Sequence, residues 1–164
     1  MKLAFNCTFT HEGVSNVSID RLWKAGILDA HNLMPKLLPD VITKVELLEG
    51  DGGAGTVKKF VFSEAVKEFR YIVDKTDALD DENHIIKQTV VEGGLIGSRL
   101  KSYSFELKLE AGSNGKTVEK TTVHYETLDD TPLSVEEQGQ INASFSLMTK
   151  AVEEHLIANP AAYA

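Results

Sequence analysis

Cysteine is nearly missing from this 164-residue chain, in which Cys7 carries the only thiol. A single cysteine excludes an intrachain disulfide, so packing and hydrogen bonds must stabilise the fold. Cys7 lies among β-favouring residues, and no base is indicated beside it. We interpret it as a small buried apolar side chain and not as a catalytic thiol.

Long hydrophobic runs are also missing. The apolar residues after Lys2 are interrupted at Asn6, which leaves too short a core for a signal peptide. No other run approaches the roughly 20 apolar residues that a membrane-spanning helix needs. We therefore expect a cytoplasmic protein without a membrane partner, and a nuclear location would also fit these observations.

Basic residues are outnumbered by acidic ones, with 17 Lys and Arg against 25 Asp and Glu and a net charge of −8. Nucleic-acid affinity comes largely from cations that neutralise phosphates, so this balance disfavours a stable nucleic-acid complex. The histidines lack the spacing of a zinc site, and we expect no metal and no cofactor. They are His11, His31, His84, His124 and His155.

Glycine is concentrated in the segment EGDGGAGTVKKFVF, Glu49 to Phe62, which matches the pattern G-x-G-x-x-G. A dinucleotide-binding loop needs a helix after its glycines, but β-favouring residues follow here. A Walker loop is excluded because Thr56-Val57 follows Gly55 instead of Lys-Ser or Lys-Thr. We predict a hairpin connection with several positive φ angles. This glycine-rich loop comprises Gly50, Asp51, Gly52, Gly53 and Gly55.

Periodicity along the rest of the chain predicts one strand, two short helices, six strands and one long helix. The predicted strands are Lys2–Glu12, Ile42–Leu48, Val57–Phe62, Glu68–Thr76, His84–Glu92, Arg99–Glu110 and Val118–Thr127. The short helices are Val17–Leu28 and His31–Leu38, and the long helix, Ser134–Ala158, begins with a Ser134/Glu137 capping box. Short connections favour an antiparallel meander, and only the long helix is large enough to cover it. We expect residues 1–164 to form one domain.

Four blocks of the sequence carry a family resemblance. They are ELLEGDGGAGTVKKFVF, RLWKAGILDAHNLMPKLLPD, KQTVVEGGLIGSRL and KAVEEHLIANPAAYA. With them the chain resembles the pathogenesis-related class-10 plant proteins, the family of the major birch pollen allergen, over nearly its whole length. AHNLMPKLLPD and LIANPAAYA are most similar to monocot members. The resemblance implies an α+β, helix-grip (START-like) fold, in which a curved seven-stranded antiparallel sheet grips a long C-terminal helix and two short helices follow strand 1.

The resemblance also implies a cavity between sheet and long helix that holds small amphipathic ligands: cytokinins and other phytohormones, flavonoids or sterol-like metabolites. Strand alternation, the apolar stripe of the long helix and matching family positions predict its lining, although the same residues could form a solid core. Gly26 stands where Phe is common and Phe145 where a small residue is common, so ligand preference does not transfer from a relative. The predicted lining is Ile27, His31, Leu38, Phe60, Phe62, Tyr71, Ile86, Gln88, Val90, Tyr103, Phe105, Tyr125, Ile141, Phe145 and Met148.

Enzymatic alternatives remain open at this point. Ribonuclease activity in the family is attributed to positions that match Lys58, Glu153 and, in place of a tyrosine, His155. A norcoclaurine-synthase-like condensation would use a strand lysine near the position of Lys120. Abscisic acid receptors share the fold, but their gate-loop motifs are not found here, which disfavours phosphatase inhibition. We expect a monomeric defence-related binding protein, with an enzyme as the alternative.

Overall fold

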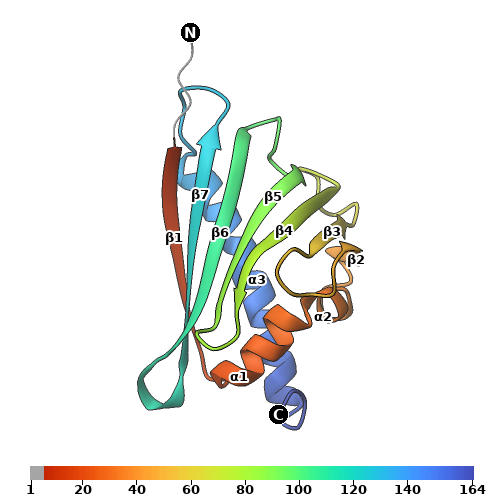
Figure 1. The fold of residues 1–164 in the computed structure, drawn as a ribbon, viewed down its shortest axis with the longest axis vertical. Coiled ribbons are helices and arrows are strands. Elements are labelled where there is room, and N and C mark those ends of the chain that lie inside the picture. The colour runs from red at the N-terminus through yellow and green to blue at the C-terminus, as the bar shows by residue number, and fades with distance from the viewer. Residues whose placement is uncertain (1–5) are drawn as a thin grey trace.

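The computed structural model describes residues 6–164, so the predicted strand start at Lys2 lies outside the described residues. In chain order the elements are β1 (Asn6–Ser15), α1 (Ile19–Leu22), η1 (Trp23–Leu28), α2 (Ala30–Leu37), β2 (Ile42–Glu49), β3 (Val57–Phe62), β4 (Tyr71–Asp80), β5 (Ile85–Gly93), β6 (Leu100–Ala111), η2 (Ser113–Gly115), β7 (Thr117–Thr127) and α3 (Val135–Ala158). Figure 1 shows the sheet with α3 running behind it and α1 and α2 at one end.

The strands form one seven-stranded antiparallel sheet in the order β1-β7-β6-β5-β4-β3-β2. Five of these pairings join neighbours in the chain, and β1 pairs with β7. Register shifts interrupt the β2–β3, β4–β5 and β6–β7 pairs. Such irregularities bend and twist a strand pair, and they fit the curvature of this sheet. The predicted helix-grip fold is confirmed.

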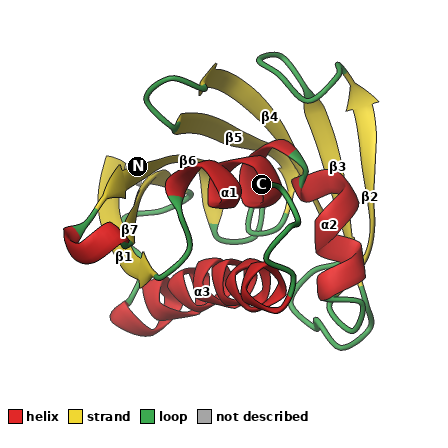
Figure 2. Cartoon of the chain, turned by 90° about the horizontal axis from the view of Figure 1, so that it is seen from below, coloured by secondary structure: helices red, strands yellow, loops and turns green. Residues whose placement is uncertain are grey.

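Helix α3 lies across the concave side of the sheet. Figure 2, which views the molecule from below, shows the strands arching over α3. Helices α1 and α2 lie at this lower end of the molecule. The Ser134 hydroxyl accepts a hydrogen bond from Glu137 N, and the Glu137 carboxylate accepts one from Ser134 N, as a capping box requires.

The first helical segment differs from its prediction. A single helix with a start signal at Ser18 or Asp20 is expected within Val17–Leu28, and Ser18 is indeed the N-cap of α1. After Leu22, however, the chain widens into the π-helical turn η1. Gly26 lies in this turn, and a Cβ added there would meet Val152 of α3 at 3.6 Å. The turn therefore brings its backbone close to α3, a tertiary effect that sequence periodicity does not show.

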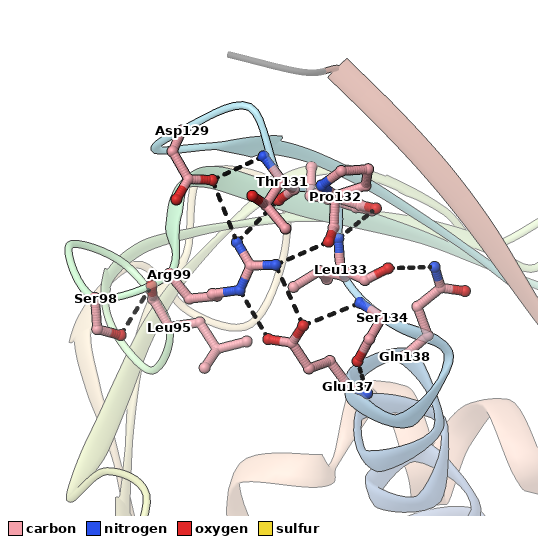
Figure 3. A network of polar contacts seen from close by, with 11 residues as sticks. Leu95, Ser98, Arg99, Asp129, Thr131, Pro132, Leu133, Ser134, Glu137 and Gln138 are labelled. Atoms are coloured by element: carbon pink, nitrogen blue, oxygen red, sulfur yellow. Dashed lines mark hydrogen bonds and ion pairs between the residues drawn. The ribbon is translucent and has the colours of Figure 1, made fainter. Parts of the chain in front are cut away.

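Arginines from outside α3 fix both of its ends. At the start, Arg99 donates to the Glu137 carboxylate at 2.8 Å and to the carbonyls of Thr131 and Pro132, as Figure 3 shows. At the far end, Arg21 of α1 donates to the carbonyls of Leu156, Asn159 and Ala162. Between these two fixed ends, the middle of α3 crosses the concave face of the sheet.

Candidate functional site

A cavity of about 420 Å³ lies between the concave face of the sheet and α3. The helices α1, η1 and α2 close one side of it with Leu22, Gly26, Ile27, Ala30 and Met34. Helix α3 contributes Gln140, Ile141, Ser144, Phe145, Leu147, Met148, Thr149 and Val152. The remaining lining comes chiefly from β3 to β7 and is mostly apolar, so the interior offers a low-polarity environment with a few polar groups.

Most of the predicted lining residues lie around this cavity. They are Ile27, Leu38, Phe60, Phe62, Ile86, Gln88, Val90, Tyr103, Phe105, Ile141, Phe145 and Met148. Phe145 packs edge-on against Phe105, with ring centroids 5.5 Å apart, and so projects from α3 toward β6. These placements support a shared site, and ligand contact by each residue stays a prediction.

The cavity lining does not include His31, Tyr71 or Tyr125. Tyr71 begins β4, whose cavity-lining residues are Ile72 and Asp74, so alternation turns Tyr71 to the other face, where its ring lies under Lys59. The hydroxyl of Tyr125 accepts a hydrogen bond from Leu133 N at 3.1 Å, and its ring packs in the core.

His31 lies in α2 and contacts its neighbour Asn32 at 3.3 Å. Its Nδ1 atom is buried without a hydrogen-bond partner among residues 6–164. The prediction that this imidazole orients a ligand in the main cavity therefore has no support from the lining.

Two charged residues that the sequence reasoning did not place in the cavity lie deep inside it. Lys58 of β3 and Asp74 of β4 are register partners, with 3% and 5% of their surfaces exposed, and both line the cavity. Partners across antiparallel strands project from the same face of the sheet, which explains why both point inward. Asp74 Oδ1 is buried without a hydrogen-bond partner in the described part of the chain.

Burial dominates the electrostatics of this pair. It raises the pKa of Asp74 to about 6, against the opposing effect of Lys58. It also lowers the pKa of the Lys58 ammonium, although the Asp74 charge opposes that shift. Burial and the Asp74 charge raise the pKa of nearby Tyr103 to about 12, so its hydroxyl stays protonated. The pair therefore holds titratable groups whose charged forms are poorly solvated.

A second polar group faces the cavity from β7. Glu119 is 7% exposed, and its carboxylate accepts a hydrogen bond from the Thr149 hydroxyl of α3 at 2.7 Å. Burial raises the pKa of Glu119, while Thr149 and His11 act in the opposite direction. Strand alternation could have found Glu119, because it shares the inward face of β7 with Val123.

The glycine-rich loop joins β2 to β3 and not a strand to a helix. Gly50, Gly52 and Gly55 have positive φ, and a Cβ on Gly50 would lie 2.8 Å from the Thr56 Cα. Gly52 N donates to the Thr56 hydroxyl at 2.8 Å, which tightens the loop internally. Because β3 follows, no helix N-terminus is available beside the loop to hold a pyrophosphate.

The structure separates the residues of the enzymatic alternatives. Lys58 lines the cavity, whereas Glu153 and His155 lie in the last turns of α3 and are not part of that lining. Lys120 is exposed and forms an ion pair with Glu110 at 3.0 Å, which raises its pKa. Lys120 thus lacks the burial that would lower the pKa of a reactive lysine.

A metal-binding cluster and a membrane-spanning helix are both absent from the described residues. Among residues 6–164, no three His, Cys, Asp or Glu side chains are grouped so that they could hold a metal ion. Within the same range, none of the helices combines the length and the apolar character that crossing a membrane requires.

Comparisons with known proteins place the chain among plant relatives. The family model described as "Pathogenesis-related protein Bet v 1 family" matches residues 4–159. Major allergen Pru av 1 of Prunus avium is 38% identical, over 95% of this chain and 97% of that relative. Pathogenesis-related protein 1 of the monocot Asparagus officinalis is 35% identical over the same shares.

Solved structures show the same architecture. The crystal structure of Ara h 8.0201 superposes with a TM-score of 0.82 at 34% identity and covers 94% of this chain and all of that one. Norcoclaurine synthase from Thalictrum flavum has a TM-score of 0.74 at 20% identity, covering 94% of this chain and 88% of that one. At that identity the likeness to the synthase concerns the fold alone.

Proposed function

The chain belongs to the pathogenesis-related protein Bet v 1 family, and on that basis we propose that it is a defence-related binding protein that holds a small amphipathic molecule in its internal cavity. The observation that carries this proposal is the cavity of about 420 Å³ enclosed by the sheet and α3. Ligand sites of small molecules typically occupy about 300–1,000 Å³ and combine apolar walls with a few placed polar groups. Protein interiors without a ligand to hold are normally close-packed, so a void of this size argues for an occupant.

The chemistry of the lining favours a flat or elongated, largely apolar ligand with polar groups at its edges. Aromatic rings of Phe60, Phe105 and Phe145 offer stacking surfaces. Gln88 and Asp74 offer hydrogen bonds, and the unpartnered Asp74 Oδ1 favours a ligand that donates to it. Cytokinins, flavonoids and sterol-like metabolites share this mixture, and we propose them as the ligand classes to test. We further propose that the protein acts as a cytoplasmic monomer.

Displacement of a fluorescent probe from the purified protein tests the proposal. Flavonoids, cytokinins and sterols are titrated against the wild type and against Phe145→Trp, which puts a larger ring beside Phe105. The expected result is competitive, stoichiometric displacement that weakens by about tenfold or more in Phe145→Trp, because overfilling a packed site costs about 1–3 kcal/mol. Ile157→Trp, an exposed position on the same helix, is the matched control. Absence of probe uptake and of any displacement would refute the proposal.

Ribonuclease activity has less support. Burial of Lys58 in the cavity separates it from an RNA backbone at the surface, and the charge of −8 opposes RNA binding. RNA cleavage by the wild type that is lost in Glu153→Ala would restore this alternative, whereas equal cleavage by both proteins would indicate a contaminant.

A further inference from the structure

We infer that Lys58 captures aldehydes: its side-chain amine forms an imine with an amphipathic aldehyde in the cavity, and the Asp74 carboxyl transfers the protons of the reaction. This inference rests on the proposed function, since the aldehyde must first enter as a cavity ligand. It goes beyond that function by assigning a covalent step and a nucleophile.

The position of Lys58 is the first support. Lysine is almost never fully buried unless it is paired, yet Lys58 is only 3% exposed and lines an apolar cavity. Asp74 lies directly across the β3–β4 ladder, and the two side chains share one face. Asp74 Oδ1 is buried without a hydrogen-bond partner in the described part of the chain, so this oxygen can still accept a proton or a hydrogen bond from a ligand. Phe60 and Ile72, adjacent on the same strand pair, supply an apolar surface for the body of the ligand.

Burial shifts the protonation equilibrium of Lys58 toward the neutral amine, which is the reactive form. Burial lowers the pKa of Lys58, and a lysine desolvated in an apolar pocket is a recognised way of activating an amine as a nucleophile. Burial also keeps the pKa of Asp74 at about 6, close to neutrality. A carboxyl group with such a pKa can both give and take a proton near pH 6–7.

The reaction balances without a cofactor or a redox partner. The Lys58 nitrogen attacks the aldehyde carbon, and proton transfer yields a neutral carbinolamine. Protonated Asp74 then donates its proton to the carbinolamine hydroxyl, which leaves as water while the nitrogen lone pair forms the C=N bond. The resulting iminium cation faces the Asp74 carboxylate, which either stays as its counter-ion or takes the proton back. The net change is amine plus aldehyde to imine plus water.

The other lysines supply an internal comparison. Lys120 is exposed and paired with Glu110, which raises its pKa and keeps it protonated. Lys59, the next residue after Lys58, faces the opposite side of β3, where its ammonium lies 4.8 Å from the Tyr71 ring centroid. An aldehyde that reacts only by surface chemistry would modify such accessible amines first, whereas capture in the cavity selects Lys58.

Reductive trapping tests the inference on the intact wild-type chain. The protein is incubated at pH 7 with 3-phenylpropanal and sodium cyanoborohydride, and modified lysines are located by peptide mapping. We expect Lys58 to be labelled several-fold faster than Lys120, because burial lowers the pKa of Lys58 while Glu110 raises the pKa of Lys120, so that Lys58 has the larger free-amine fraction. Labelling of Lys58 should cease when 3-phenylpropan-1-ol, which cannot form an imine, is added in saturating amount. Displacement of the fluorescent probe by 3-phenylpropanal and by its alcohol, 3-phenylpropan-1-ol, is measured in parallel.

The two proposals fail in different ways. If both compounds displace the probe but Lys58 is labelled no faster than Lys120, imine formation is refuted and ligand binding stands. If neither compound displaces the probe and Lys58 is not labelled, the cavity does not bind this class of molecule. That result refutes imine formation and also the part of the proposed function that concerns such ligands. Lys58→Met, checked for folding by circular dichroism, should lose the fast label while Lys120→Met keeps it.

Asp74→Asn separates proton transfer from simple electrostatics. Removing the carboxylate lowers the pKa of Lys58 further, because Asp74 normally raises it. If Asp74 acted only through its charge, Asp74→Asn would therefore speed the labelling of Lys58. If it transfers protons, labelling should slow by about tenfold or more, as expected on losing a general acid–base group.

Discussion

The two ends of α3 are fixed by arginines, but by different chemistry. At the N-terminal end, Arg99 pairs with the Glu137 carboxylate and also reaches Asp129 at 3.8 Å. At the C-terminal end, the hydrogen bonds of Arg21 within residues 6–164 go only to backbone carbonyls, those of Leu156, Asn159 and Ala162. The first contact depends on the charge of an acid, whereas the second satisfies carbonyls that the end of a helix leaves without partners.

The comparison explains how the fold can keep a hollow interior. A helix fixed at both ends does not need dense packing along its middle, where α3 faces the cavity through Ile141, Phe145 and Met148. The stability of the molecule is therefore expected to depend more on the ends of α3 than on cavity-facing positions that make few polar contacts.

Arg21→Met should have the largest effect. The substitution keeps the aliphatic part of the side chain but removes the charged hydrogen bonds to three carbonyls and the favourable charge at the helix C-terminus. Urea unfolding should show a loss of about 3 kcal/mol, since hydrogen bonds to charged groups contribute about 1.5–3 kcal/mol each and are not additive. Lys24→Met, an exposed position in the adjoining turn, should change the free energy of unfolding by less than about 0.5 kcal/mol.

Arg99→Met should lower the free energy of unfolding by a smaller amount, about 1–2 kcal/mol. The substitution removes the ion pair with Glu137 and the hydrogen bonds to the Thr131 and Pro132 carbonyls, but the ion pair is partly exposed and therefore contributes little. The difference between wild type and Arg99→Met should shrink in 1 M salt, which screens charges over a few ångströms. The Arg21→Met difference should keep most of its size. If the two differences in unfolding free energy depended equally on salt, the contrast between the two ends of α3 would be contradicted.

The pH dependence of stability should have opposite signs for two glutamates, Glu137 at the N-terminal end of α3 and Glu119 opposite its middle. Arg99 and Ser134 lower the pKa of Glu137, so the folded state binds that proton more weakly than the unfolded chain. The stability that Glu137 adds is present above the ordinary carboxyl pKa near 4.5 and is lost as the pH falls through the lowered value. Subtracting the unfolding free energy of Glu137→Gln from that of the wild type should therefore give a difference that rises with pH.

Glu119, opposite the middle of α3, should show the reverse. Burial raises its pKa, so the folded state binds the proton more tightly and loses stability as the pH rises from about 4.5 through the raised value. The difference between wild type and Glu119→Gln should therefore fall with pH. Urea unfolding of both variants between pH 3 and 8 checks the two signs, and a rising difference for Glu119 would contradict its burial as the dominant cause.

Gly26→Ala should have the smallest effect. Its added Cβ would lie in ordinary contact with Val152 at 3.6 Å, and replacing a helical glycine by alanine stabilises by up to about 1 kcal/mol. Thermal unfolding should show a gain of that order, and ligand affinity should change slightly because Gly26 lines the cavity. A loss of stability would mean that η1 cannot accept a Cβ beside α3.

The sequence predicts the order of the elements because the local signals are strong. The capping box at Ser134, the turn glycines and the alternation in β7 each act over a few residues. The π-helical turn at Trp23–Leu28 was missed because close approach to α3, and not local propensity, determines it.

The polar groups of the cavity were harder to predict. In VKKF the pattern says that one of the adjacent lysines faces inward, but burying it is acceptable only beside Asp74, and that pairing depends on the β3–β4 register. Tyr71 is not part of the lining because the β3–β4 register places its neighbours Ile72 and Asp74 on the cavity face of β4. Side-chain direction in a strand depends on register, which a sequence alone does not determine.

The strand order has a consequence for how the chain folds. From β2 to β7 every pairing is a hairpin between sequence neighbours, so this part of the sheet can assemble step by step from local contacts. β1 must instead find β7, and the bond from the Thr117 hydroxyl to the Val17 carbonyl joins residues 100 positions apart. Closing so long a loop costs more chain entropy than closing any of the hairpins. We therefore expect β1 to dock late, after the meander has formed the edge that receives it.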